Sequence, residues 1–409
     1  MLVQRFFKSF ARLSGVVFVC MSLAGCSRED PVEPAPVAVV GQSLNDVGSE
    51  QPTEPERKLL IGVVGPETGP EAQYGQSVYQ GVLLAAQGLN DAGGIGGEKL
   101  EVVHFDNKGG QGRTRDIVQH FVDQKAMAII AAPTGWATFA PTYLSNDSKT
   151  ILISIGSRRK VARSGDYIFQ MSLNDEIATA YMVEHAIREQ GFTRLALVTA
   201  SDYDYSLDVS ALFKIALNSH DAELVFETDT YDTYTGQHDL RSATTKLLEV
   251  ADSLDAIIFT GSASEAAELL QGLLKENVRL PLLGGEDLFS DEFLDAAGES
   301  AIGSLVYATY PNQSLLRTKD FISTYEVQYQ TKPDRFSALA FDATTLVANA
   351  IAESDSRKSS VVRETLLASK LVDGVTGTSE FAAQGTSINV PLIYKVVAGQ
   401  NIGRFALQN

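Results

Sequence analysis

A serine and a lysine at the spacing used for acylation stand together in this sequence. Ser157 and Lys160 satisfy the pattern Ser-x-x-Lys, in which the lysine side chain assists the serine as a nucleophile. The Lys-Thr-Gly that accompanies this pair in penicillin-recognising enzymes does not follow. Ser157 also comes just after an expected strand instead of opening a helix. The pair keeps an enzyme in consideration and does not by itself indicate one.

Metal and phosphate chemistry have weaker candidates. The histidines are His104, His120, His185, His220 and His238, and none has ligand spacing. Asp202, Asp204 and Asp208 resemble a calcium loop faintly, but the glycine and terminal glutamate of such a loop are missing. The glycine-rich run 93–97 follows an expected helix and precedes a strand, which is the reverse of a dinucleotide fingerprint. We therefore expect no metal and no cofactor.

The N-terminus has the pattern of an export signal. Residues 1–13 carry Arg5, Lys8 and Arg12 and no acid, and residues 14–25 are apolar but too short for a membrane span. The segment ends Leu-Ala-Gly before Cys26, which resembles the lipobox of bacterial lipoproteins. We expect residues 1–25 to be a lipoprotein signal peptide and Cys26 to carry lipid. The alternative is a signal peptide without lipidation.

The segment that follows indicates how the protein is connected to the membrane. Residues 26–57 are rich in proline, acids and serine and lack periodicity, so we expect a disordered tether. Cleavage would leave Cys26 as the only thiol, which excludes an internal disulfide. We expect an exported protein anchored in the membrane by lipid and facing the periplasm or cell exterior. By resemblance to lipoproteins of double-membrane bacteria, Ser27 favours the outer membrane.

The charge balance limits the choice of partners. The chain has 409 residues, with 33 lysines and arginines against 51 acids and a formal charge of −18. Nucleic acid as a partner is disfavoured, because a phosphate backbone is bound by lysine and arginine. The apolar share of 44% is that of a globular protein.

Apolar runs alternate with amphipathic segments from about residue 58 onward. Expected strands are 59–64, 100–106, 127–132, 150–155, 194–200, 222–228, 256–261, 280–285, 303–309 and 388–397. Expected helices are 76–90, 176–190, 262–277, 317–330, 335–354 and 359–369. Asn174 is a plausible N-cap, and Ser262 with Glu265 forms a capping box. The alternation predicts an α/β fold with parallel sheets, whose ligands bind at the carboxyl ends of the strands.

Several motifs together resemble the branched-chain amino-acid binding proteins, which are type I periplasmic solute-binding proteins of ABC transporters. The match starts at residues 61–75, continues through residues 90–106, and returns at 204–206, 284–286 and 341–346. It covers about residues 58–400. The resemblance implies two Rossmann-like lobes with parallel sheets, joined by a three-strand hinge. We place one lobe at 58–172 and 307–377, and the other at 173–306 and 378–409.

The resemblance also implies ligand-binding residues. The loop at Thr134, Gly135 and Trp136 would meet a ligand carboxylate, with Trp136 either a pocket wall or a packing anchor. The loop at Gly156, Ser157 and Arg158 would do the same. Arg158 replaces the family's usual threonine; it either contacts a second acidic group of the ligand or, as we expect, points into solvent. Glu286 would pair with a ligand ammonium. The remaining expected wall residues are Tyr74, Tyr205, Ser262 and Phe336.

These observations favour a lipoprotein that captures a small amino acid or similar polar solute by lobe closure. Its expected partners are the ligand, ABC permease subunits and the membrane, with no enzymatic activity. The alternative is a ligand sensor without transport, or an activator of a cell-wall synthase, with the same fold. An enzyme would depend on Ser157 and Lys160 alone.

Overall fold

The computed structural model describes residues 58–158, 160–200, 204–232, 237–238, 240–399 and 403–408. The expected signal peptide, the tether and Cys26 lie outside the described residues.

The first sheet has five parallel strands in the order β2-β1-β3-β4-β5. These are β1 (Lys58–Gly65), β2 (Lys99–Asp106), β3 (Ala128–Ala131), β4 (Ile151–Ile155) and β5 (Ile168–Met171). Every residue of β3, β4 and β5 is buried. A parallel sheet covered on both faces needs such continuously apolar strands.

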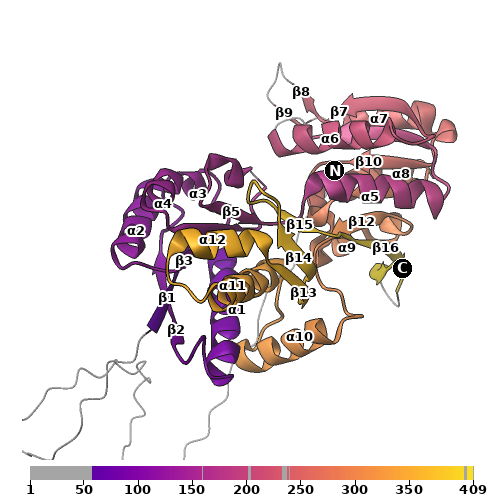
Figure 1. Ribbon diagram of the computed structural model, residues 1–409. Helices are drawn as coiled ribbons and strands as arrows, with labels where there is room; N and C mark the ends of the chain where they lie inside the picture. The colour runs from indigo at the N-terminus through magenta and orange to yellow at the C-terminus, as the bar shows by residue number, and fades with distance from the viewer. Residues whose placement is uncertain are drawn as a thin grey trace, which may run out of the picture. The chain divides into compact units, whose positions relative to one another are not determined.

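Helices from distant parts of the chain cover this sheet. One face packs against α1 (Ala72–Asp91), α11 (Arg335–Ser354) and α12 (Ser359–Ala368). The other face packs against α2 (Gln111–Asp123) and α4 (Thr142–Ser148), and the short α3 (Trp136–Phe139) lies between β3 and α4 in the chain. We call these elements the first lobe, together with α10 (Leu316–Tyr329), which packs beside α1 and α11 (Figure 1).

The second sheet has seven strands in the order β17-β16-β12-β11-β10-β6-β7. Its parallel strands are β6 (Arg194–Thr199), β7 (Glu223–Asp229), β10 (Ala256–Phe259), β11 (Leu282–Gly284) and β12 (Leu305–Ala308). Its antiparallel strands are β16 (Leu392–Ala398) and β17 (Gly403–Leu407).

This sheet is also covered on both faces, and we call it and its helices the second lobe. One face packs against α5 (Asp175–Arg188) and α6 (Asp204–Leu217). The other packs against α7 (Leu240–Val250), α8 (Ala263–Lys275) and α9 (Asp291–Ala297). The remaining strands are β8 (Tyr231–Asp232) with β9 (Gln237–His238), and a small sheet of β13 (Lys370–Gly374), β14 (Gly377–Phe381) and β15 (Ser387–Asn389).

Helices α1 and α11 approach each other closely because glycine is present at the contact. A Cβ atom added at Gly81 would lie 2.1 Å from the backbone carbonyl oxygen of Ser337. Only a residue without a side chain fits at this distance. The contact fixes the N-terminal turn of α11, from which Arg335 extends towards the second lobe.

The fold agrees with the α/β architecture predicted from the sequence. The structure confirms the six predicted helices and nine of the predicted strands, with ends shifted by a few residues. The tenth, 388–397, is wrong as one strand: it is divided into β15 and β16. Pro391 lies in the break, and a proline has no N–H to continue a ladder of hydrogen bonds. The expected lobe boundaries at 306/307 and 377/378 fall inside β12 and β14.

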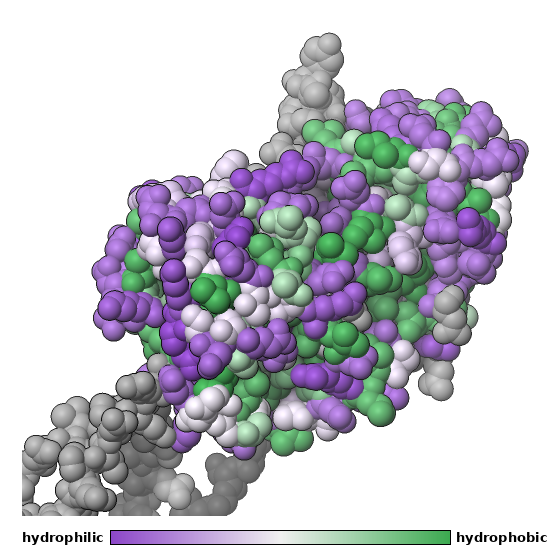
Figure 2. Space-filling model, viewed as in Figure 1, coloured by the Kyte–Doolittle hydropathy of each residue, from purple (hydrophilic) through white to green (hydrophobic). Residues whose placement is uncertain are grey.

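The described surface carries both polar and apolar side chains. On the face in Figure 2, hydrophobic residues are interspersed among hydrophilic ones. Among the described helices, none combines the length and apolar character that a membrane crossing requires.

Candidate ligand-binding site

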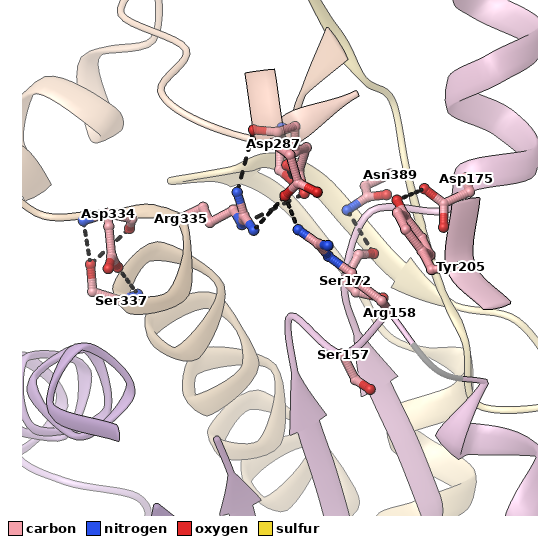
Figure 3. Close-up of polar contacts among 12 residues, drawn as sticks. Ser157, Arg158, Ser172, Asp175, Tyr205, Asp287, Asp334, Arg335, Ser337 and Asn389 are labelled. Carbon is pink, nitrogen blue, oxygen red and sulfur yellow. Dashed lines mark hydrogen bonds and ion pairs between the residues drawn. The ribbon is translucent and has the colours of Figure 1, made fainter. Parts of the chain in front are cut away.

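A small polar cavity lies where loops of the two lobes meet. Its lining residues are Gly156, Ser157, Arg158, Ser172, Leu173, Asp175, Tyr205, Glu286, Asp287 and Arg335. They follow strands β4, β5 and β11 or begin helices α5, α6 and α11, in keeping with binding at carboxyl strand ends. The cavity measures about 20 Å³, which is room for one water molecule. The lobes are therefore in close contact here (Figure 3).

The loop after β4 depends on a glycine. Gly156 has φ +61°, and a Cβ atom there would lie 2.5 Å from the ring of Phe336. Phe336 is buried beneath the loop. The guanidinium carbon of Arg335 lies over the Phe336 ring, 4.7 Å from its centroid. The glycine thus lets the α11 aromatic ring pack directly against the loop and positions the following Ser157 and Arg158.

The guanidinium of Arg158 bridges the lobes. It forms an ion pair with Asp287, which follows β11, and lies 5.0 Å from the centroid of the Tyr205 ring. The side chain of Arg158 is 45% exposed, in line with the expectation that it points into solvent, but its guanidinium group also contacts the second lobe. The sequence did not reveal Asp287 as a partner, because the two residues belong to different lobes and meet only in the folded protein.

Glu286 lies where the sequence placed it, just beyond strand β11. Its Oε1 accepts a hydrogen bond from the backbone N–H of Thr309 at 2.7 Å and another from the Thr309 hydroxyl group. Its Oε2 lies 3.8 Å from Nε of Arg335. The carboxylate is thus held at one oxygen by the start of the connection after β12, while the other oxygen faces a cation.

Arg335 is the clearest functional candidate that the sequence did not reveal. Its guanidinium lies 3.7 Å from Asp287 Oδ1, and its Nη1 donates to the Glu286 carbonyl oxygen at 3.5 Å. Charge-assisted hydrogen bonds are usually 2.7–2.9 Å long, so these contacts are loose. The available signal was its position next to Phe336, which the resemblance had marked as a wall residue.

Tyr205 and Asp175 form a second polar pair at the second lobe. The Tyr205 hydroxyl donates to Asp175 Oδ1 at 2.9 Å. Burial raises the pKa of Tyr205 well above its usual value, so the phenol stays protonated. Burial also raises the pKa of Asp175 to about 6, and the charge of Glu286 adds to this; the Tyr205 hydrogen bond and Arg158 oppose it.

The other predicted site residues lie away from this cavity. Tyr74 is 40% exposed, and its ring centroid is 4.9 Å from that of Phe336. Trp136 is 59% exposed, beside Phe139 in α3, and follows Gly135 and the buried Thr134. Ser262 caps α8 in a complete capping box with Glu265, as the sequence predicted. None of Tyr74, Thr134, Gly135, Trp136 and Ser262 lines the 20 Å³ cavity.

Two other chemical hypotheses can be compared with the geometry. Lys160 of the Ser-x-x-Lys pair forms an ion pair at 3.0 Å with Asp208 on α6. In the described part of the chain, no three or more His, Cys, Asp or Glu side chains are grouped to hold a metal ion.

Comparison with known proteins identifies the family. The periplasmic binding protein family matches residues 58–400, so the chain belongs to that family, whose members bind solutes and are not enzymes. An amino acid binding protein of Pseudomonas aeruginosa is 25% identical over 59% of this chain, which spans only 63% of that relative's length. A Leu/Ile/Val-binding protein homologue of Brucella melitensis is 24% identical, and the match covers 80% of this chain and 88% of the length of that relative.

A solved structure supports the same fold. The branched-chain amino acid transporter substrate binding protein LivJ from Streptococcus pneumoniae, in complex with isoleucine, superposes with a TM-score of 0.67. It is 25% identical in sequence, and the match covers 86% of this chain and all of the other. The type I periplasmic binding protein fold with two lobes, predicted from the sequence, is confirmed.

Proposed function

We propose that this protein is an extracytoplasmic binding protein that captures a small amino acid or a related polar solute by lobe closure and delivers it to an ABC permease. The observation that carries the proposal is the meeting of charged side chains from both lobes at the carboxyl ends of their strands. The named relatives that bind amino acids or Leu, Ile and Val support the choice of ligand.

A zwitterionic ligand suits this mixture of charges. Its ammonium group needs an anion, because a buried unpaired charge is costly, and Glu286 provides a carboxylate with one oxygen facing the cleft region. Its carboxylate would be met by donors of the first lobe. The other residues that we propose to contact ligand are Tyr74, Thr134, Gly135, Trp136, Gly156, Ser157, Arg158, Tyr205, Ser262 and Phe336.

Opening of the lobes is required for a solute to enter the 20 Å³ cavity, which does not hold anything larger than water. The ion pair between Arg158 and Asp287 would break on opening. A ligand that brings its own carboxylate and ammonium can replace such contacts and hold the lobes together. This is closure by hinge bending, in which ligand shifts the balance between open and closed forms.

Anchoring by lipid at Cys26 is part of the proposal and has its support in the sequence. The pattern of charge, apolar run and cysteine at residues 1–26 favours it. The tether of residues 27–57 would let the binding domain move relative to the membrane.

The first experiment is a thermal-shift screen of the purified protein against amino acids and organic acids. A ligand at 100 times its Kd stabilises a protein by about 2.7 kcal/mol, which such a screen detects. The decisive variant is Glu286→Gln, which keeps the shape and removes the charge. Calorimetry should show a loss of about 2–5 kcal/mol in binding of an amino acid, as when one member of a buried charge pair is removed.

Glu299→Gln is the matched control. Glu299 belongs to the second lobe, its side chain is 78% exposed, and it does not line the cavity. This variant should bind as the wild type does. A change of less than about threefold, roughly 0.7 kcal/mol, in Glu286→Gln would refute the pairing of Glu286 with an ammonium group.

A further inference from the structure

A groove much larger than the central cavity lies on the other side of Arg335. Its volume is about 550 Å³, within the range of roughly 300–1,000 Å³ that small-molecule sites occupy. Its walls come from both lobes: α10, the start of α11 and residues 308–313 on one side, the start of α9 and β17 on the other. A solute in this groove would contact both lobes at once.

Two charged residues form the boundary between the groove and the small cavity. Arg335 and Glu286 line both spaces. Their charged groups stand 3.8 Å apart at Nε and Oε2, a contact too long for a strong hydrogen bond. The Arg335 side chain is only 25% exposed, yet its contacts with Glu286 and Asp287 are all 3.5 Å or longer. A cation and an anion held side by side, each with unused hydrogen-bonding capacity, match the head group of an α-amino acid.

One part of the groove suits a flat apolar side chain, although the charged Asp291, Glu326, Lys332 and Asp334 also line it. Four of its lining residues are aromatic, namely Phe289, Tyr310, Phe336 and Phe405. Phe289 and Phe405 already pair, with ring centroids 4.5 Å apart, and Phe336 lies beneath the Arg335 guanidinium. Aromatic rings prefer such offset or tilted neighbours at 4.5–7 Å. Valine or leucine would leave most of this volume empty.

We propose that the groove is the side-chain chamber of the ligand site and that the solute is an aromatic α-amino acid. Its carboxylate binds Arg335, its ammonium binds Glu286, and its ring lies among Phe289, Phe336 and Phe405. This inference rests on the proposed capture of an amino acid and narrows it to one class. It assigns Arg335, and the groove itself, a role in selecting the ligand.

Binding of defined probes to the purified protein tests the proposal by calorimetry. L-phenylalanine should bind at least tenfold more tightly than L-valine. 3-Phenylpropionate lacks the ammonium and phenethylamine lacks the carboxylate, so each should bind at least tenfold more weakly than L-phenylalanine. Equal affinity for L-phenylalanine and 3-phenylpropionate would overturn the pairing with Glu286.

Two variants test the two parts of the chamber. Arg335→Gln should weaken L-phenylalanine at least tenfold, whereas Arg317→Gln, which removes an exposed charge from the neighbouring α10, should have no effect. Gln313→Trp places a ring into the groove from an exposed lining position and should weaken L-phenylalanine more than L-valine. Gln119→Trp makes the same change on α2, away from the groove, and should bind both as the wild type does.

The outcomes separate this inference from the proposed function. Preference for L-valine, together with an unchanged affinity in Gln313→Trp, would overturn the aromatic chamber and leave amino-acid capture intact. If neither L-phenylalanine nor L-valine binds at millimolar concentration, the aromatic chamber is refuted, and the thermal-shift screen of amino acids and organic acids decides the proposed function separately. Circular dichroism on each variant excludes misfolding as the cause of lost binding.

Discussion

In the described part of the chain, every charged pair that joins the lobes has its cation in the first lobe and its anion in the second. Arg158, Lys160 and Arg335 belong to the first lobe, and their partners Asp287, Asp208 and Glu286 belong to the second. Such complementary edges should favour closure even without ligand. We therefore predict that Asp287→Asn shifts the ligand-free protein towards an open form.

The size of the effect follows from how exposed the pair is. The side chain of Arg158 is 45% exposed and that of Asp287 is 26% exposed. Pairs of this exposure contribute about 0.2–1 kcal/mol, because solvent screens them. Arg335 lies 3.7 Å from the same carboxylate and adds less. Loss of up to about 1 kcal/mol would shift the ratio of closed to open forms by up to roughly fivefold.

Small-angle scattering of the ligand-free protein measures this shift as a larger radius of gyration. Asp255→Asn provides a closely matched control, because Asp255 pairs with Arg194 at 3.1 Å within the second lobe, with exposures of 24% and 47%. That variant should lose stability without expanding. High salt should expand the wild type and have little further effect on Asp287→Asn, since a Debye length of about 3 Å at 1 M screens the pair.

Two results would refute the reasoning. If Asp287→Asn and the wild type give the same scattering curve at low salt, the pair does not hold the lobes together. If Asp255→Asn expands the protein as much, the effect comes from general destabilisation and not from the cleft.

Three further predictions concern packing, pH and anchoring. Gly81→Ala should destabilise by about 1–3 kcal/mol in urea unfolding, because its Cβ would meet a backbone oxygen at 2.1 Å. A Cβ atom added at Gly88 in the same helix would meet no atom within 4 Å, so Gly88→Ala should stabilise by about 0.5–1 kcal/mol. Equal effects of the two substitutions on the free energy of unfolding would contradict the packing argument. The pKa of Asp175 is raised from 3.8 to about 6, so between these pH values the folded state keeps a proton that the unfolded state has lost. The free energy of unfolding therefore falls as the pH rises through this range. Asp175→Asn should flatten that decline in thermal unfolding, and an unchanged pH profile would show that Asp175 is not its source. Cys26→Ser should release the protein from the membrane fraction with the binding domain folded, and retention there would refute lipid anchoring at this residue.

Local signals in the sequence were sufficient for about half of the described elements, and helices such as α2, α6 and α7 were not predicted. Continuous apolar runs such as 128–131 and 256–259 are buried strands, as predicted. The Asn174 cap accepts hydrogen bonds from the backbone N–H groups of Glu176 and Ile177. The signals work because strand burial, helix capping and turn formation depend on residues close together in the chain. Pro391 is an exception. A proline interrupts a ladder of hydrogen bonds, but the long apolar run around it led us to predict one strand over 388–397.

Part of the site was also predictable, through position at strand ends. Glu286 and the loop 156–158 follow β11 and β4 in the sequence, and both line the cavity. Their location needs only the rule that parallel strands present their carboxyl ends at one edge.

Tertiary structure alone decided which charges meet. Asp287, Asp175 and Arg335 have no local pattern that marks them, and Arg158 was expected in solvent. Arg335 reaches Glu286 because the close packing of α11 on α1 directs its first turn towards the second lobe. The sequence by itself determined the two α/β lobes and the loops that face each other. Partner choice and the volume of the groove depend on distances between segments far apart in the chain, which only the folded packing sets.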